Sequence, residues 1–584
     1  MSSDSSATTF AIARKHTFLG KLWALTWPYF WSEERWIARG LLAVVVALSL
    51  GLVYINVQLN YWNNDFYNAL QNKDLAEFWK QLQKFAMLAV AYIVVAVYYI
   101  YLRQMMQIRW RRWMTQDLLA KWLADRSYYH LQLGDRGADN PEQRIETDVS
   151  QFTSSSLVLS LDLMNSVVSL VTFVVILWTL SGPLGFTLLG HEINIPGYMV
   201  WAALLYSLVG SLLTYWIGRP LVQINFLLQR FGASFRFAMT RLRENAESVA
   251  FYGGEPIERQ GLSAAFDNIW GNWWRLMRQQ KRLTWFTAGF NQLANIFPVL
   301  VVAPRYFAGS IQLGGIFQTA SAFGQVQGAL SWFVGAFTDL AEWKATVDRL
   351  TGFVDAIAGT KDLTSGIRVA KTPARQIRMT DLELGLPGGR VLLENLSAEI
   401  AAGARVMVTG PSGSGKTTLF RALAGLWPFG SGSVESPADA RALFLPQRPY
   451  LPIGTLRQAI AYPGRAEDHG DAEIQAALRD VKLEHLAGRL DEAGNWSMAL
   501  SVGEQQRLAI ARALLLKPDW LFLDEATAAL DEANEQLMYA LLAERLPAAT
   551  ILSIAHRPAV ARYHRMRLAI VPETRTATLS DLPA

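Results

Sequence analysis

A glycine-rich stretch that follows an apolar run has residue types and spacing suited to phosphate chemistry. It reads "RVMVTGPSGSGKTTLFRALAG", and residues 405–409 at its start are typical of a buried strand. Glycines let the backbone curl so that its N–H groups point at phosphate oxygens, and the N-terminus of the next helix adds a favourable dipole. We expect Lys416 to reach the β- and γ-phosphates of a nucleotide and Thr417 to hold Mg²⁺. The predicted phosphate-binding set is Gly410, Pro411, Ser412, Gly413, Ser414, Gly415, Lys416, Thr417 and Thr418.

Two adjacent acids at the end of a second apolar run supply complementary chemistry. The segment "DWLFLDEATAALD" predicts a strand that ends at Asp524 and Glu525. Asp524 would bind Mg²⁺ through its water shell, and Glu525 would orient and deprotonate the attacking water. A strand that merely ends at a polar loop is the alternative, but it rarely follows a phosphate-binding loop. The two motifs together predict hydrolysis of ATP with Mg²⁺.

The segment between these motifs, "LSVGEQQRLAIARALLLKPD", resembles the signature of ABC transporter ATPases. The resemblance covers residues 375–570, with the motifs in the family's order. It implies that Gln447 in "FLPQRPY" is the Q-loop glutamine, with roles in catalysis and at the metal. It also implies that Asp531 in "AALD" is the D-loop aspartate and that His556 in "ILSIAHRP" contacts the γ-phosphate. A histidine after a strand is more often structural, but its place after the acidic pair favours the functional role.

The same resemblance implies an assembly. In ABC ATPases the signature of one domain completes the phosphate site of another, and the residues that would do so here are Ser501, Gly503 and Glu504. The chain has one signature and one phosphate-binding loop, so we expect a half-transporter that works as a dimer with two ATP. A homodimer is the simplest case, although a related partner chain would serve as well.

Two residues depart from the family pattern. Val502 stands where the signature most often has glycine, but a backbone N–H remains available there, so we expect the site to work. Leu386 occupies the place of the aromatic residue that often stacks on adenine. Weaker stacking leaves the selectivity between ATP and GTP open.

Composition separates these motifs from the rest of the chain. The 584 residues are 51% hydrophobic and 18% charged, whereas soluble domains carry about 25% charged residues. The apolar excess lies in the first 340 residues. A helix needs roughly 20 apolar residues to cross a bilayer. Six segments qualify, at 37–59, 82–102, 158–181, 197–218, 284–304 and 316–337.

The loops between these segments predict their orientation. Residues 103–150 hold eight Lys or Arg and residues 219–282 hold ten, whereas 181–197 hold none. Because short loops rich in Lys and Arg stay in the cytoplasm, we expect both termini and the ATPase domain on that side of a bacterial inner membrane. Topology then accounts for the net charge of +5, and no nucleic-acid partner is predicted. The polar start "MSSDSSATTF" lacks the pattern of a signal peptide.

The predicted organisation has four parts. Residues 1–36 form a polar tail and an interfacial helix, "FLGKLWALTWPYFW", that lies on membrane lipid; a disordered lead-in is the alternative. A six-helix transmembrane domain spans 37–345, a linker spans 346–374, and the nucleotide-binding domain spans 375–584. The expected fold class is a six-helix exporter-type ABC membrane domain fused to an α/β P-loop ABC ATPase domain.

The membrane half carries a resemblance of its own. The segments "LNYWNNDFYNALQNKD", "NPEQRIETDVSQF" and "ENAESVAFYGGE" resemble the membrane domain of SbmA/BacA-type peptide-uptake permeases and their ATPase-fused relatives. The last two also resemble the peroxisomal fatty-acyl ABC transporters. The resemblance covers most of 36–345 and implies uptake of peptides or similar compounds. The SbmA/BacA permeases themselves are driven by protons and lack an ATPase domain, so proton coupling stays open.

Polar residues share helix faces within the predicted spans, and lipid cannot satisfy them. We therefore expect a wet cavity and a hydrophilic substrate, a peptide or a vitamin-like molecule. At the outer end of the first span, "YWNNDFYNALQNKD" would place Asn64 and Asp65 at the mouth of the pathway. The residues that share faces are Asn56 with Asn60, Asn291 with Asn295, Gln318 with Ser321 and Gln325, and Asp162 with Ser166.

The expected function is ATP-driven transport. ATP binding would close two ATPase domains, and exposed segments near 140–150 and 244–255 would pass that closure to the membrane helices. One alternative is export of lipid-like or drug-like molecules. Another is a membrane ATPase that senses or regulates and moves nothing.

Overall fold

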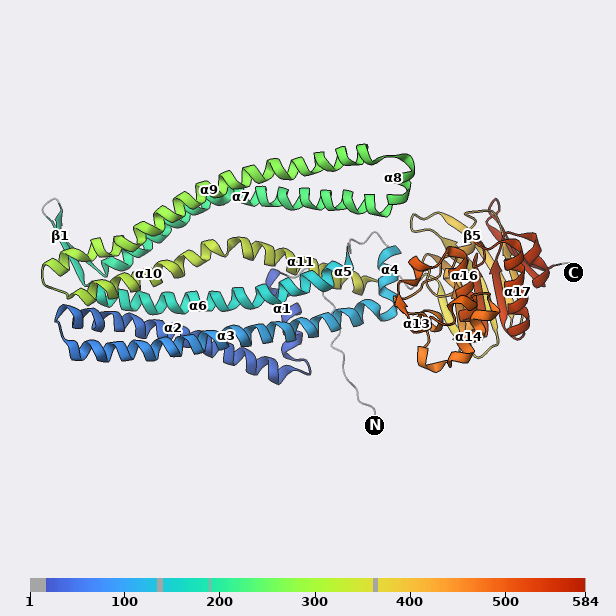
Figure 1. Ribbon diagram of the computed structural model, residues 1–584, viewed down its shortest axis with the longest axis horizontal. Coiled ribbons are helices and arrows are strands. Elements are labelled where there is room, and N and C mark those ends of the chain that lie inside the picture. Colours follow the sequence, from blue (N-terminus) through green and yellow to red (C-terminus); the bar gives the residue numbers. More distant parts are fainter. Residues whose placement is uncertain (1–16, 134–139, 189–190, 361–365, 583–584) are drawn as a thin grey trace. The chain divides into compact units, whose positions relative to one another are not determined.

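The computed structural model describes residues 17–133, 140–188, 191–360 and 366–582 (Figure 1). The chain divides into two compact units. The first combines Met1–Leu119 with Asp139–Val354, and the second combines Ala120–Ala138 with Asp355–Ala584. The first unit is helical apart from one hairpin, and the second is built mainly on a six-stranded and a four-stranded sheet.

Long helices make up the first unit. A short helix, α1 (Phe18–Phe30), precedes them, and Trp23, Trp27 and Trp31 stack along its outer face while Leu25 and Tyr29 are buried. A two-stranded hairpin, β1 (Pro183–Leu188) with β2 (His191–Pro196), joins two of the long helices. The long helices are α2 (Arg35–Gln71), α3 (Leu75–Leu123), α6 (Val149–Ser181), α7 (Tyr198–Glu244), α9 (Glu255–Phe307), α10 (Leu313–Gly335) and α11 (Phe337–Gly359).

The predicted spans lie in these helices. Among the described residues, five helices are long and apolar enough to cross a membrane, and they contain the first five predicted spans. The sixth predicted span corresponds to α10, which falls short of that apolarity although it has 23 residues. Three glutamines, Gln318, Gln325 and Gln327, lower its hydropathy. It nevertheless packs against α2, α6, α7 and α9, so its polar positions lie inside the bundle.

The two long connections between predicted spans, residues 103–157 and 219–283, consist largely of helix in the described residues. Figure 1 shows α7 and α9 as an antiparallel pair joined by the short α8 (Ala246–Tyr252), so the predicted break near 244–255 is present. In the first connection the helix breaks at Ala124–Arg126, where Asp125 and Arg126 have positive φ angles of 50° and 56°. Residues 134–139 lie outside the described part. The chain is helical again through α5 (Pro141–Gln143) and a π-turn at Arg144–Asp148.

The outer end of α2 differs from the prediction. The helix continues to Gln71 instead of ending near residue 59, and its polar side chains bind the start of α10. Asn68 Oδ1 accepts from Gly314 N at 2.9 Å, and Gln71 Oε1 accepts from Leu313 N at 2.6 Å. A Cβ on Gly314 would lie 2.1 Å from the carbonyl oxygen of Asn64, so only glycine permits this close approach.

The two residues predicted at the mouth of the pathway, Asn64 and Asp65, both make side-chain contacts in the single chain. Asn64 Oδ1 accepts from the amide of Asn68 at 3.0 Å, so its side chain serves the helix junction. Asp65 remains about half exposed and pairs with Lys84 at 3.4 Å. Both residues are partly exposed, and their place at the mouth of a pathway stays a prediction.

In residues 366–582, the larger sheet has six strands in the order β14-β13-β6-β12-β11-β8. The strands β6, β12, β11 and β8 run parallel to their neighbours, so their carboxyl ends meet at one edge. The loops after such ends are where α/β proteins bind ligands. The bounds are β6 (Arg405–Thr409), β8 (Ala442–Leu445), β11 (Trp520–Asp524), β12 (Thr550–Ile554), β13 (Met566–Val571) and β14 (Thr576–Asp581).

A second sheet of four strands has the order β3-β7-β4-β5. Its bounds are β3 (Arg368–Thr372), β4 (Gln376–Gly385), β5 (Val391–Ala401) and β7 (Gly430–Pro437). The segment 346–374, predicted as a linker, is therefore helical as far as Gly359 and already part of this sheet at Arg368. Residues 361–365 lie outside the described part.

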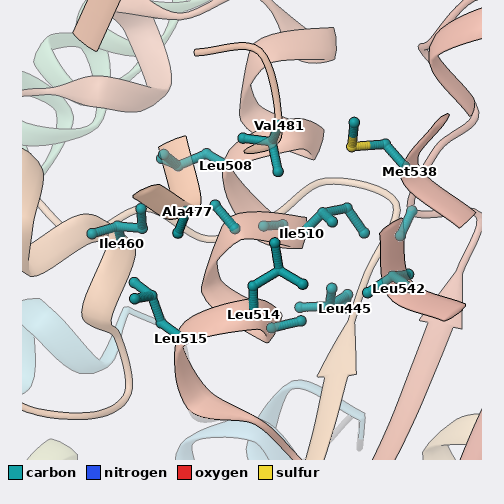
Figure 2. Close-up of a cluster of buried hydrophobic side chains, with 14 of the residues drawn as sticks. Leu445, Ile460, Ala477, Val481, Leu508, Ile510, Leu514, Leu515, Met538 and Leu542 are labelled. Atoms are coloured by element: carbon teal, nitrogen blue, oxygen red, sulfur yellow. The ribbon is translucent and has the colours of Figure 1, made fainter. Parts of the chain in front are cut away.

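Helices cover the larger sheet and hold the signature segment. Figure 2 shows Leu508, Ile510 and Leu514 of α16 packed with side chains of α14 and α17, all of them buried. This core fixes the direction of α16, whose first turn carries the signature. The helices are α12 (Lys416–Leu423), α13 (Leu456–Ala461), α14 (Asp471–Asp480), α15 (Trp496–Ala499), α16 (Val502–Leu516) and α17 (Glu532–Arg545).

Candidate active site

The glycine-rich loop leaves β6 and enters α12, as predicted. Gly415 is the N-cap of α12 with φ of +94°, a conformation that a residue with a side chain rarely adopts. A Cβ on Gly410 would lie 2.9 Å from the carbonyl oxygen of Ile570. The loop therefore requires glycine at both ends. It brings together all of the predicted phosphate-binding residues from Gly410 to Thr418, directly before or within the first turn of α12.

Lys416 is held inside this loop. Its Nζ donates to the carbonyl oxygens of Gly410 at 2.8 Å and Pro411 at 2.9 Å, and the residue is only 7% exposed. Burial lowers the pKa of Lys416, while the nearby Glu525 and Asp524 act in the opposite direction. Two carbonyl oxygens of the loop thus fix the position of the ammonium group inside the predicted phosphate-binding loop.

Thr417 and Asp524 meet across the strand ends. Thr417 Oγ1 donates to Asp524 Oδ1 at 3.1 Å. Burial raises the pKa of Asp524, and the charge of Glu525 adds to the rise, while the Thr417 hydroxyl lowers it. A hydroxyl, a carboxylate and the amide oxygen of Gln447 are the hard oxygen donors that Mg²⁺ prefers. The donor set fits the ion.

Glu525 is held on both carboxylate oxygens. Gln447 Nε2 donates to Oε2 at 3.1 Å, and His556 Nε2 lies 3.0 Å from Oε1. The three residues follow β11, β8 and β12, which are neighbours in the sheet. Glu525 itself has φ of 52°, an unfavourable conformation of the kind found at functional sites. The sheet thus assembles a carboxylate, an amide and an imidazole that are far apart in the sequence.

The signature residues form the first turn of α16. Ser501 is the N-cap, and its hydroxyl accepts from Glu504 N at 3.3 Å and donates to Glu504 Oε2 at 2.8 Å. Glu504 Oε2 also accepts from Ser501 N at 2.9 Å, and these hydrogen bonds hold the pKa of Glu504 below its usual value. Gly503 lies in this turn, while Val502 is exposed. The turn presents a helix N-terminus, which attracts anions.

Asp531 has a local role in the structure. It is the N-cap of α17, where its Oδ1 accepts from Asn534 N at 2.7 Å. The carboxylate therefore fixes the start of α17 next to the catalytic acids. Its predicted role as the D-loop aspartate among the nucleotide-binding residues stays a prediction.

Gln506, on α16, was missed by the sequence analysis. It is 1% exposed, its Nε2 donates to the carbonyl oxygen of Gln447 at 2.9 Å, and its Oε1 accepts from Ala529 N at 2.9 Å. One side chain therefore joins the signature helix to the loops that carry Gln447 and Asp531. The only available signal was a polar residue on the buried face of an apolar helix.

Residues 124–133 were also missed, and they belong to the same compact unit as the ATPase. Arg126 donates to the carbonyl oxygen of Ala424 at 2.8 Å, at the C-terminal end of α12. In α4 (Ser127–Leu133), Ser127 Oγ accepts from Thr360 at 3.1 Å and Leu133 packs on the sheet core. A cavity of about 570 Å³ separates this segment from the sheet, and Thr417 and Asp524 line it too.

The fold and the site define a class: a multi-pass membrane protein fused to a P-loop ATPase. Residues 25–307 match the family described as ABC transporter transmembrane region 2, and residues 393–528 match the ABC transporter ATPase family. The inner membrane ABC transporter ATP-binding protein YddA of Escherichia coli K12 is 35% identical over 548 residues, 93% of this chain and 96% of YddA. The chain therefore belongs to the ABC transporter family, which couples ATP hydrolysis to transport.

Two further proteins widen the comparison. The human lysosomal cobalamin transporter ABCD4 is 26% identical over 579 residues, 91% of this chain and 92% of that protein. A bacterial Atm1-family ABC exporter with ATP bound has a similar structure, with a TM-score of 0.65 and 20% identity over 91% of this chain and 94% of the exporter. This second likeness confirms the predicted exporter-type fold. The likeness to SbmA/BacA permeases stays a prediction.

Proposed function

We propose that the chain is one half of a homodimer that uses ATP to take up hydrophilic peptides or vitamin-like molecules across a bacterial inner membrane. Its relatives include an inner membrane protein and a cobalamin transporter by name. In the membrane unit the proposal rests on two exposed asparagines within a predicted span, Asn291 and Asn295. In the ATPase it rests on the site residues that the sheet brings together.

The site residues divide the chemistry of hydrolysis. Lys416 and the loop N–H groups bind the phosphates, and Glu525, held by Gln447 and His556, takes the proton of the attacking water. Thr417, Asp524 and Gln447 would hold Mg²⁺, which neutralises developing charge on the phosphates when it is bound. His556 would contact the γ-phosphate from its place beside Glu525.

The dimer follows from the signature turn. The chain has one signature and one phosphate loop, and the N-terminus of α16 with Ser501, Gly503 and Glu504 is a ready site for phosphate oxygens. A second copy would supply that turn to the first copy's ATP. The charge of the loops supports a cytoplasmic location for both termini and the ATPase.

The polar residues favour a hydrophilic cargo. Asn291 and Asn295 lie one turn apart on α9 and are exposed in the single chain. Polar side chains within a span are costly when they face lipid. They would therefore line an aqueous pathway in the dimer, which suits a peptide or vitamin better than an acyl chain.

The contact of Arg126 with α12 offers a route for coupling. α12 begins at the phosphate loop and ends at Ala424, whose carbonyl oxygen Arg126 binds. Movement of α12 on ATP binding would reach α3 through the break at Ala124–Arg126. This route is proposed beside the predicted ones through 140–150 and 244–255, and those two stay predictions.

Transport in proteoliposomes tests the proposal. ATP added outside drives only molecules whose ATPase faces outward, so an uptake system should release preloaded cargo from the lumen. Cobalamin, a hydrophilic decapeptide, an acyl-CoA and a hydrophobic dye should be compared, with Glu525→Gln as the inactive control. We expect ATP-dependent release of a hydrophilic cargo. Accumulation of the dye or the acyl-CoA in the lumen would instead favour the lipid or drug exporter, and ATP hydrolysis without movement of any cargo would favour the sensor.

A further inference from the structure

A buried carboxylate outside the predicted site ties together the loops that carry the site. Glu535 lies on α17, and its side chain is 4% exposed. Its Oε1 accepts from Thr527 Oγ1 at 2.7 Å, and its Oε2 accepts from Arg557 Nη1 at 3.1 Å. The same Nη1 donates to the carbonyl oxygen of Leu530 at 2.7 Å.

Each partner of this carboxylate adjoins a site residue. Thr527 is two residues after Glu525, Leu530 precedes Asp531, and Arg557 follows His556. We propose that Glu535 and Arg557 are positioning residues that hold Glu525, His556 and Asp531 in their mutual geometry. We call the pair the Glu535–Arg557 clamp. The inference rests on the proposed roles of Glu525 and His556.

The chemistry of the clamp supports this role. A carboxylate leaves water at a high cost unless its oxygens find partners, so Glu535 holds Thr527 and Arg557 firmly. Arg557 can reach two acceptors at once because a guanidinium presents several N–H groups in a fixed plane. The contact that depends on this arrangement is His556 Nε2 to Glu525 Oε1, at 3.0 Å. The ion pair between buried Glu535 and half-exposed Arg557 thus joins the loop from 525 to 531 to the loop after β12.

The clamp predicts a specific kinetic change. Phosphate binding depends on Lys416 and the loop backbone, which the clamp does not touch, so KM for ATP should stay near its normal value. Loss of the clamp should shift Glu525 relative to the attacking water. A displacement of about 1 Å can lower the rate about 100-fold. We expect Arg557→Gln and Glu535→Gln to lower kcat by about 10- to 100-fold. Arg557→Lys should recover part of the loss because it keeps the charge.

The experiment measures ATP turnover of the full-length protein in nanodiscs, with binding of a fluorescent ATP analogue as a check on folding. Arg545→Gln is the matched control, because Arg545 lies on the same helix and pairs with Asp480 at 2.8 Å near the surface. It should leave kcat unchanged. Arg557 is 40% exposed, so its substitution should disturb folding less than that of buried Glu535. Arg557→Gln therefore tests the clamp even if Glu535→Gln does not fold.

A double variant separates positioning from a general structural role. If the clamp acts through the base, Glu525→Gln combined with Arg557→Gln should turn over ATP no more slowly than Glu525→Gln alone. A further multiplicative loss in the double variant, or normal kcat in both single variants, would overturn the clamp. Normal turnover in Glu525→Gln alone would instead overturn the proposed role of Glu525, and the clamp with it.

Discussion

Polar side chains serve different purposes in the two units of this protein: in the ATPase unit they form a site, and in the membrane unit they bond to neighbouring helices. In the ATPase unit, Thr417, Asp524 and Glu525 meet other functional groups at the ends of parallel strands. In the membrane unit, Asn60 donates to the carbonyl oxygen of Gln318, and Asn68 binds the N–H of Gly314. The residue types are similarly polar, but a strand end opens onto solvent, whereas a packed helix offers only the backbone and side chains of its neighbours.

The comparison shows how far a motif can be trusted. A polar residue in a loop after a buried strand has few structural duties, so its type indicates chemistry. A polar side chain within a helical bundle must find a hydrogen-bond partner in the protein, because lipid supplies none. The free N–H and C=O groups at the end of a neighbouring helix are such partners. Function in the membrane unit is therefore best sought at polar positions that the single chain leaves exposed, such as Asn291 and Asn295.

The largest expected effect tests the ATPase side of the comparison. Glu525→Gln removes the proton acceptor and keeps the shape, so hydrolysis should fall by at least about 100-fold while ATP stays bound. Turnover and retained nucleotide are measured on the purified protein. Glu573→Gln, at an exposed position, is the control and should turn over normally. A rate near that of the unmodified protein would show that Glu525 is not the base.

The second prediction tests the membrane side. Asn68→Ala removes the acceptor for Gly314 N at the start of α10, and loss of a helix cap costs about 1 kcal/mol. We expect a lower unfolding temperature in detergent and nearly normal basal ATP hydrolysis. Asn72→Ala, at an exposed asparagine just beyond α2, should leave both unchanged. Unaltered stability together with a selective loss of transport would instead indicate a pathway role for Asn68.

The third prediction concerns pH and the core of the ATPase. His564 is buried, its Nδ1 donates to the carbonyl oxygen of Val560 at 3.0 Å, and its Nε2 accepts from Ser553 at 2.9 Å. Burial lowers the pKa of His564 below its usual value of 6.5. The neutral form stabilises the fold, so this contribution is present above pH 6.5 and is lost as pH falls further.

Thermal unfolding at pH 7.5 and 5.5 checks the sign. His564→Asn should be less stable at pH 7.5 but lose less stability than the unmodified protein when the pH drops. His485→Asn, at an exposed histidine, is the control and should retain the original pH dependence. A pH dependence that does not change in His564→Asn would contradict the prediction.

The smallest expected effect concerns the nucleotide base. Leu386 is partly buried against the sheet core and offers no aromatic face, so ATP and GTP should be hydrolysed at similar rates. Leu386→Tyr should add a stacking surface and shift the preference toward ATP. A preference above about tenfold in the unmodified protein, worth about 1.4 kcal/mol, would show that other residues recognise adenine.

Most of the ATPase site was predictable because it is encoded in short motifs. The loop from Gly410 to Thr418 lies in one continuous turn, so its geometry follows from local residue types. The role of His556 was implied only by a family resemblance, and its contact with Glu525 was not predicted, since that contact depends on β11 and β12 being neighbours. Gln506, Glu535 and Arg126 were not predicted at all. Each acts through a partner at least eight residues away, and no local pattern marks such a partner.

The membrane unit divides in the same way. Apolar length alone located the spans, because the bilayer sets a minimum number of residues. It did not reveal that α2 continues to Gln71, because a polar helix end and a polar loop have the same composition.

The amino-acid sequence by itself determined two things about this protein: that it crosses a membrane several times, and that it binds and hydrolyses a nucleotide. Both depend on local properties, the apolar length of a helix and the glycine spacing of a loop. Only the tertiary structure decided which polar side chains are free for function. Asn68 is occupied by the N–H of Gly314, and Glu535 by Thr527 and Arg557. Hydrogen-bond partners that are distant in the chain are chosen by packing, because a buried polar group binds whichever partner the fold brings within reach.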